Sequence, residues 1–181
     1  SPFTGKIDLT TNTGLDSKKF LVPFQGGFDG FNPAKAKNVG NDISATNTQG
    51  FDLSTGTASG SIAYKRALNA ISNPDEFDIN MIVTPGVIHE YHPSITNKAI
   101  DVAEARADAF YVMDGSRWGR SVDNAIQDIK ALDTNYAATY YPWVKIQDIN
   151  TNKPTWVPPS VVLPAVIANT DRVSHEWFAP A

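Results

Sequence analysis

The segment 89–92, which holds two histidines and one acid, comes nearest in this chain to a metal-binding motif. A zinc metalloprotease helix carries two histidines four residues apart, so that both rings reach one ion. His89 and His92 are only three residues apart, and Pro93 stands where the second histidine of that motif belongs. We therefore predict no metal here and expect both histidines to be hydrogen-bonded or exposed in a polar loop.

Acidic residues close to the ends of predicted strands are the next candidates for chemistry. Asp114 follows a short apolar run, and ligands of open α/β sheets usually bind where a parallel strand ends. No second carboxylate follows two residues later, and Asp-Gly is also a common turn. The alternative to a structural protein is a ligand-binding or hydrolytic enzyme domain with its site at these strand ends. It would need Asp29, Asp114 and Asp148 within a few ångströms of one another around a concave pocket.

Two further patterns lack the spacing that catalysis or phosphate binding requires. The glycines of residues 26–30 follow a predicted strand, but the Gly-Lys-Ser/Thr ending of a phosphate loop is missing. Phe28 would crowd a phosphate, so we expect a tight turn instead. Ser174, His175 and Glu176 are adjacent in sequence and therefore cannot face one another as a triad does. We predict no catalytic residue and no cofactor.

Composition excludes several classes of protein. The chain of 181 residues has a net charge of −4 and a pI near 5.2, whereas nucleic-acid binding needs a clustered basic surface. Arg117 and Arg120 come nearest to such a patch, and we expect them to be solvated. The absence of cysteine excludes disulfides. The longest nearly apolar run, residues 161–168, is too short to span a membrane.

Three stretches have the apolar spacing of helices. Residues 59–72 place Tyr64, Leu68 and Ile71 on one face behind a Ser-Gly-Ser start that can cap the first turn. Residues 94–106 follow Pro93 with a similar stripe. The third stretch, 121–132, sets five apolar side chains on one face, namely Val122, Ala125, Ile126, Ile129 and Leu132. Each helix should pack on a sheet through this stripe.

The predicted strands are residues 21–24, 79–83, 110–113 and 139–146. Their centres are mostly continuously apolar, as expected when helices cover both faces of a sheet. Strands that alternate with helices predict an α/β fold, a three-layer sandwich with a mostly parallel or mixed sheet. Trp156 and Val157 should add an edge hairpin after a polar turn at 150–153. A last helix should start after Ser160, capped by it and bent by Pro164.

We expect residues 1–20 to be an extension from a neighbouring region and residues 21–181 to form the α/β domain, with a long loop at 25–58. Since the sequence starts without methionine and stops within a motif, we interpret it as an internal fragment of a longer polypeptide.

Aromatic residues are concentrated in the last third of the chain. They could pack in the core or a hairpin, and they could also contact a partner. Strand alternation over residues 139–146 would send Tyr140 and Tyr141 to opposite faces. The candidates for subunit-interface or packing residues are Tyr140, Tyr141, Trp143, Trp156, Trp177 and Phe178.

Four motifs occur in a fixed order in this third of the chain: Tyr140-Tyr141-Pro142-Trp143, Pro158-Pro159-Ser160, Ala168-Asn169-Thr170-Asp171 and Phe178-Ala179-Pro180-Ala181. In this order they resemble the subunit of the contractile tail sheath of tailed bacteriophages of the myovirus type. A Pro-Phe-x-Gly-Gly-x-Asp-Gly stretch at 23–30 extends the resemblance. Between these parts the similarity depends mainly on the alternation of strands and helices.

The resemblance implies a structural viral protein without enzymatic activity, cofactor or metal. Such subunits polymerise helically around the inner tail tube and contract to drive the tube through the host envelope. The implied partners are other sheath subunits, with the tube protein and the baseplate bound through regions outside this fragment, and neither nucleic acid nor membrane insertion is implied. The implied location is the virion, after assembly in the bacterial cytoplasm. An adhesive module on a particle surface is a third interpretation, which would require exposed aromatics that bind sugars.

Overall fold

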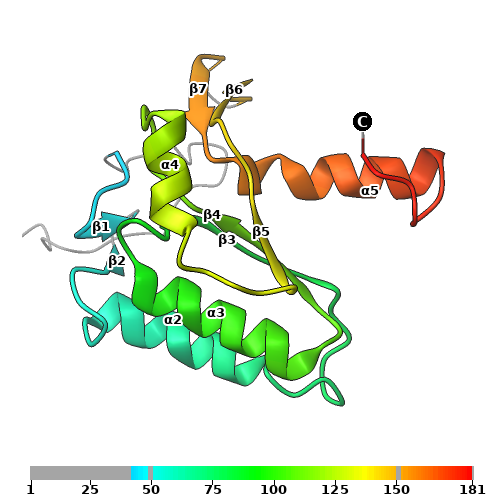
Figure 1. The fold of residues 1–181 in the computed structure, drawn as a ribbon, viewed down its shortest axis with the longest axis horizontal. Coiled ribbons are helices and arrows are strands. Elements are labelled where there is room, and N and C mark those ends of the chain that lie inside the picture. The colour runs from blue at the N-terminus through cyan, green and yellow to red at the C-terminus, as the bar shows by residue number, and fades with distance from the viewer. Residues whose placement is uncertain (1–41, 49–50, 150–151, 181) are drawn as a thin grey trace, which may run out of the picture. The chain divides into compact units, whose positions relative to one another are not determined.

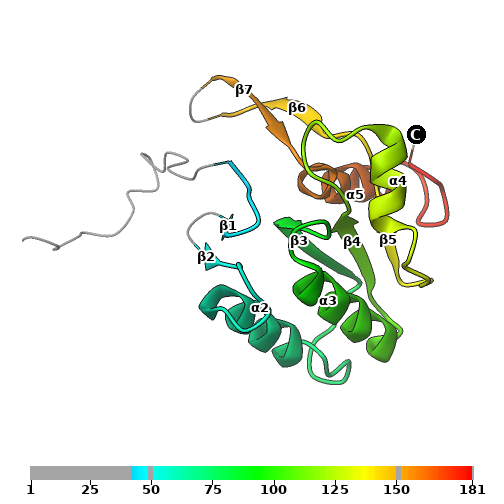
Figure 2. The same cartoon turned by 60° about the vertical axis from the view of Figure 1, so that its left-hand side comes forward.

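The computed structural model describes residues 42–48, 51–149 and 152–180. All of them belong to one compact unit, residues 37–181. The predicted extension at 1–20, the strand at 21–24, the glycine turn with Asp29 and the first part of the long loop lie outside the described residues. The described part of that loop contains a short antiparallel hairpin, in which β1 (Asn47–Thr48) pairs with β2 (Phe51–Asp52) beside the start of the next helix (Figure 2).

The centre of the fold is a parallel sheet of three strands in the order β3-β4-β5. They are β3 (Met81–Ile88), β4 (Phe110–Asp114) and β5 (Ala137–Thr139) (Figure 1). The strands predicted at 79–83 and 110–113 are confirmed. The first is longer than predicted because it continues through Pro85 and Gly86, where its register with β4 shifts and Gly86 has a φ of 85°. That positive φ suits glycine.

Helices α2 (Ser59–Ala70) and α3 (Pro93–Arg106) cover one face of the sheet and confirm the first two predicted helices (Figure 1). Their buried side chains form the core with one set of strand residues, among them Leu68, Ile95, Ala99, Tyr111 and Met113. The predicted serine cap of α2 is wrong. Ala58 is the N-cap without a side-chain bond, and Ser61 Oγ instead donates 2.6 Å to the carbonyl of Thr55.

Arg106, at the end of α3, fixes the connection between α2 and β3. Its side chain is fully buried and its guanidinium donates to the carbonyls of Ile71, Asn73 and Phe77 at 2.6, 3.1 and 2.7 Å. Asp108 accepts two further bonds at 2.8 and 2.9 Å. A buried charge is tolerated only when it is paired in this way.

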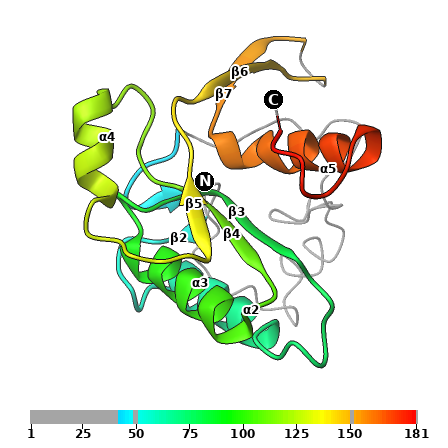
Figure 3. The same ribbon diagram turned by 45° about the vertical axis from the view of Figure 1, so that its right-hand side comes forward.

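The opposite face of the sheet is covered by a 3-10 turn, η2 (Pro159–Val161), which contacts β3 and β4. Because side chains alternate along a strand, Asp114 points away from Tyr111 and Met113 and meets Ser160 of η2. Layers on both faces confirm the predicted α/β sandwich. α4 (Val122–Ile129) follows β4 and is shorter than the predicted helix, since it ends before Leu132 (Figure 3).

The strand predicted at 139–146 is two strands. β5 ends at Thr139, and β6 (Val144–Gln147) pairs with β7 (Pro154–Val157) in an antiparallel hairpin, which confirms the predicted edge hairpin. The Tyr141-Pro142 bond between them is cis. The predicted strand alternation at residues 140–143 is wrong, because these residues lie between β5 and β6 and Pro142 lacks the N–H that a ladder needs.

The last helix, α5 (Leu163–Val173), contacts η2 and buries none of its own residues. Its predicted cap is wrong, since Val162 and not Ser160 is the N-cap. Pro164 is consequently the second helical residue, where no intrahelical donor is needed, and the predicted bend has no cause. No described helix is long and apolar enough to cross a membrane.

Candidate functional site

The carboxyl ends of the three parallel strands, where a ligand of an α/β fold usually lies, are joined by hydrogen bonds within the chain. The amide of His89 donates to the carbonyl of Asp114 at 2.8 Å, and the amide of Glu90 donates to that of Gly115 at 3.1 Å. Thr139 Oγ1 accepts the Gly115 amide at 2.9 Å. A Cβ at Gly115 would stand 2.7 Å from that same oxygen, so any other residue there would force a neighbouring side chain to shift.

Asp114 holds η2 to the sheet. The residue is 1% exposed, and its carboxylate accepts a 2.7 Å bond from Ser160 Oγ and a 3.1 Å bond from the Ser160 amide. Burial raises the pKa of Asp114 to about 6, although the bonds from Ser160 oppose the shift. A carboxylate engaged on both oxygens and covered by protein is a tether between two segments of chain.

Of the three acids that the enzymatic alternative brings together, the structure describes Asp114 and Asp148. Asp114 is engaged with Ser160, whereas Asp148 lies beyond β6, where its amide donates to the Lys153 carbonyl. Asp29 lies outside the described residues. Among the described residues, no group of three or more acidic, histidine or cysteine side chains is arranged to hold a metal ion.

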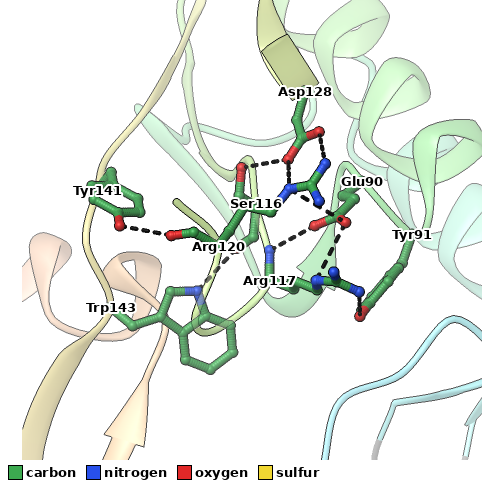
Figure 4. A network of polar contacts seen from close by, with 8 residues as sticks. All are labelled: Glu90, Tyr91, Ser116, Arg117, Arg120, Asp128, Tyr141 and Trp143. Carbon is green, nitrogen blue, oxygen red and sulfur yellow. Dashed lines mark hydrogen bonds and ion pairs between the residues drawn. The ribbon is translucent and has the colours of Figure 1, made fainter. Parts of the chain in front are cut away.

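Beside the strand ends, three ion pairs among two arginines and two acids form a connected polar network (Figure 4). Arg120 binds Asp128 through two bonds of 2.7 and 2.9 Å and lies 3.7 Å from Glu90. Arg117 lies 3.5 Å from Glu90 and also donates its amide to that carboxylate at 3.1 Å. The bond from Arg120 lowers the pKa of Asp128. Arg117 is exposed, as predicted, and Arg120 is partly exposed, but both also have acidic partners.

Two aromatic side chains are attached to the same loop by their polar atoms (Figure 4). Tyr141 donates its hydroxyl to the carbonyl of Arg120 at 2.7 Å, and Trp143 donates its indole N–H to the carbonyl of Ser116 at 2.9 Å. Ser116 in turn donates to Asp128 at 3.1 Å. These bonds fix the polar ends of both rings and leave their apolar surfaces to line the space beside α4.

That space is an apolar hollow, which we call the α4 groove, with a volume of about 130 Å³. Its main lining residues are Val122, Ala125, Ile126, Tyr140, Tyr141 and Trp143. The predicted apolar stripe of α4 only partly packs on the protein. Ala125 is buried, whereas Val122 is 56% and Ile126 is 52% exposed.

The other predicted aromatic residues also reach the surface. Trp156 on β7 lies 6.1 Å from Trp118, ring centre to ring centre, and the ammonium of Lys145 lies 5.7 Å from its ring. Trp177 and Phe178, beyond α5, are 80% and 60% exposed. The six predicted aromatics thus lie in three places. Tyr140, Tyr141 and Trp143 line the groove, Trp156 lies on the β6–β7 hairpin, and Trp177 and Phe178 follow α5.

The two histidines are both hydrogen-bonded, as predicted. His92 Nδ1 accepts the Ile88 amide at 3.2 Å, and Nε2 lies 3.1 Å from the Ser44 carbonyl, so Nε2 carries the proton. His89 Nδ1 lies 2.7 Å from Thr96 Oγ1. Burial lowers the pKa of both rings. They connect loops to α3.

Sequence reasoning missed two features of this region. The partnership of Asp114 with Ser160 joins residues 46 positions apart, and no local pattern signals it. The open half of the α4 stripe was equally hidden, because helical spacing shows that a face is apolar but not what covers it. Comparisons with models of known protein families and with curated proteins found no match to this chain.

Proposed function

We propose that this chain is part of the subunit of a bacteriophage contractile tail sheath, a structural protein that polymerises around an inner tube. The order of the four motifs between Tyr140 and Ala181 suggests the family. The observation that carries the proposal furthest is the apolar side chains exposed on ordered elements, on α4 and β7. Exposed apolar patches on a folded protein commonly mark surfaces that meet another protein.

The polar groups of the strand ends favour a structural over an enzymatic role. Asp114, the strand-end acid that an enzyme of this fold could use, accepts two bonds from Ser160. Glu90 and Asp128 are paired with arginines. Groups that are already bonded to one another stabilise the fold, and a substrate would have to displace those bonds.

In the proposed assembly, copies repeat through contacts between unlike surfaces. A contact of this kind does not close, so it continues as a helix. The extended sleeve would have a higher free energy than a contracted arrangement with more favourable contacts. A kinetic barrier would prevent it from contracting spontaneously. The α/β core would move as a rigid body while contacts between copies change.

Helical reconstruction of the phage tail that carries this chain tests the proposal. We expect residues 52–149 to fit the density of the sleeve as one rigid body in both extended and contracted tails. A sleeve built from another protein would refute the function. A sleeve containing this chain with its sheet and helices rearranged between the two states would refute the rigid-body movement.

A further inference from the structure

Residues 152–173 are attached to the sheet through one short segment. Pro158, Pro159 and Ser160 are the only buried residues in this range, and η2, which contains two of them, packs on β3 and β4. α5 contacts η2 and lies on the side of the sheet away from α2 and α3 (Figures 1 and 3). A change in the contact between η2 and the sheet would therefore move α5 as well.

The polar part of this contact is a single carboxyl group. Asp114 accepts bonds from Ser160 Oγ at 2.7 Å and from the Ser160 amide at 3.1 Å, and the Gly86 amide also donates to it. In the part of the chain that the structure describes, no arginine, lysine or histidine side chain forms an ion pair with Asp114. Its partners are neutral donors, so an ionised Asp114 leaves an uncompensated negative charge inside the protein.

This charge opposes the attachment of η2. Burial of a charge without a counter-ion costs free energy, and that cost is relieved if η2 detaches and water reaches the carboxylate. A protonated Asp114 has no such cost. It can still accept the Ser160 amide bond on one oxygen, and its hydroxyl can donate to Ser160 Oγ. The attached state therefore favours the protonated acid, and burial raises the pKa of Asp114 to about 6.

The other elements around Asp114 carry few groups that titrate. β3, β5 and η2 have no titratable side chain. Tyr111, on β4, stays neutral because burial raises its pKa above the ordinary value. After β3, the ring of His89 is bonded to Thr96 and burial lowers its pKa, while the carboxylate of Glu90 is close to two arginines. The charge of Asp114 is therefore the one that changes within the contact itself.

We infer that the contact of η2 with the sheet is a proton-controlled attachment, closed while Asp114 is protonated and able to open locally, with the sheet and α2 and α3 intact, once Asp114 is ionised. This inference concerns the fold itself and does not rest on the proposed function. Opening would free η2 and α5 to take another position. The surface that α5 presents to a partner would then differ between acidic and neutral solution.

The size of the effect follows from proton linkage. Asp114 has a pKa of about 6 in the closed state, and its ordinary value of 3.8 applies when water surrounds it in the open state. The closed state holds the proton more tightly, so a rise in pH favours opening. The equilibrium constant for opening should increase about tenfold from pH 5 to pH 7.

Hydrogen exchange followed by NMR can measure this opening. The Ser160 amide donates to Asp114 and reports on the η2 contact, whereas the Tyr111 amide donates to the Tyr136 carbonyl at 2.8 Å and reports on the sheet. After correction for the intrinsic effect of pH, exchange at Ser160 should become about tenfold faster from pH 5 to pH 7. At pH 7, a low concentration of urea should accelerate exchange at Tyr111 much more than at Ser160, because a local opening exposes little surface.

Two substitutions identify the proton. Asp114→Asn cannot ionise, so the corrected exchange of the Ser160 amide should no longer change with pH. Asp123→Asn is the matched control, because Asp123 is an exposed acid in the first turn of α4, and it should keep the tenfold change. Circular dichroism checks that both variants fold.

Three results would overturn the inference. The first is an exchange rate at Ser160 in the unsubstituted chain that, once corrected, is the same at pH 5 and pH 7. The second is a pH dependence that persists in Asp114→Asn. The third is an equal effect of urea on Ser160 and Tyr111, which would mean that η2 detaches only when the whole domain unfolds.

Discussion

The buried carboxylate of Asp114 should make the stability of this protein fall as pH rises through the mildly acidic range. Its pKa is about 6 in the folded chain, against an ordinary value of 3.8. The folded state therefore holds this proton more tightly than the unfolded state does. The contribution of the protonated Asp114 to the free energy of unfolding is complete below about pH 4 and is lost as pH rises through about 6. A difference of about two units at ~1.4 kcal/mol per unit corresponds to about 3 kcal/mol in the free energy of unfolding.

Asp114→Asn isolates this effect because the amide cannot ionise but can still accept the Ser160 amide bond. Urea unfolding followed by tryptophan fluorescence should give similar stabilities for variant and wild type near pH 4. Near pH 7, the variant should be more stable than the wild type by up to about 3 kcal/mol. The two histidines and Asp128 also titrate, but their contributions cancel in the difference between the two proteins. A difference that stays constant from pH 4 to pH 7 would refute the reasoning.

Ser160→Ala tests the other half of the tether. The 2.7 Å bond from Ser160 Oγ favours the charged carboxylate, so its loss should raise the pKa of Asp114 further. We expect a loss of about 1.5–3 kcal/mol near pH 7, the usual range for a hydrogen bond to a charged group, and a smaller loss near pH 4. Ser121→Ala is the control, since Ser121 is exposed and its side chain does not cap α4.

Three further substitutions test the packing around the sheet. Arg106→Met should lower the free energy of unfolding by about 3 kcal/mol or more in urea, because it leaves three carbonyls without their donor. Gly115→Ala should cost about 1–3 kcal/mol in the same assay, since its Cβ would stand 2.7 Å from Thr139 Oγ1 and 2.8 Å from Ile129 Cγ2; an unchanged midpoint would contradict that crowding. Asp128→Asn should lower the free energy of unfolding at pH values above the ordinary pKa of aspartate, because the ion pair with Arg120 is lost. The wild type loses the same contribution as pH falls through the lowered pKa of Asp128, so the two proteins should have similar free energies of unfolding in acid.

The main helices and strands were predictable because each has a recognisable pattern of apolar residues in the local sequence. Leu68 and Ile95 lie in stripes that α2 and α3 bury, and the apolar runs of β3 and β4 are those of covered strands. The third helix shows the limit of this reasoning. Its stripe is present, but Val122 and Ile126 remain exposed, since periodicity does not identify the covering surface.

The contacts that organise the strand ends could not be predicted, because their partners are far apart in sequence. The sequence indicates that Asp114 is a strand-end acid, but it predicts a helix cap for Ser160, the partner that Asp114 has in the fold. The bonds of Arg106 to carbonyls in the connection after α2 likewise depend on the folded path of the chain. The aromatic residues from Tyr140 to Trp143 favoured a strand, whereas Pro142 interrupts the ladder.

The attachment of α5 has a mechanical consequence. An 11-residue helix is about 16 Å long, so a rotation of about 10° at η2 would move its far end by about 3 Å. Among the described elements, α5 is attached at its first turn through η2, where Ser160 meets Asp114. A force on the far end of α5 would be transmitted to β4 through the hydrogen bonds between Ser160 and Asp114. The rigidity of this attachment would therefore depend on whether Asp114 is protonated.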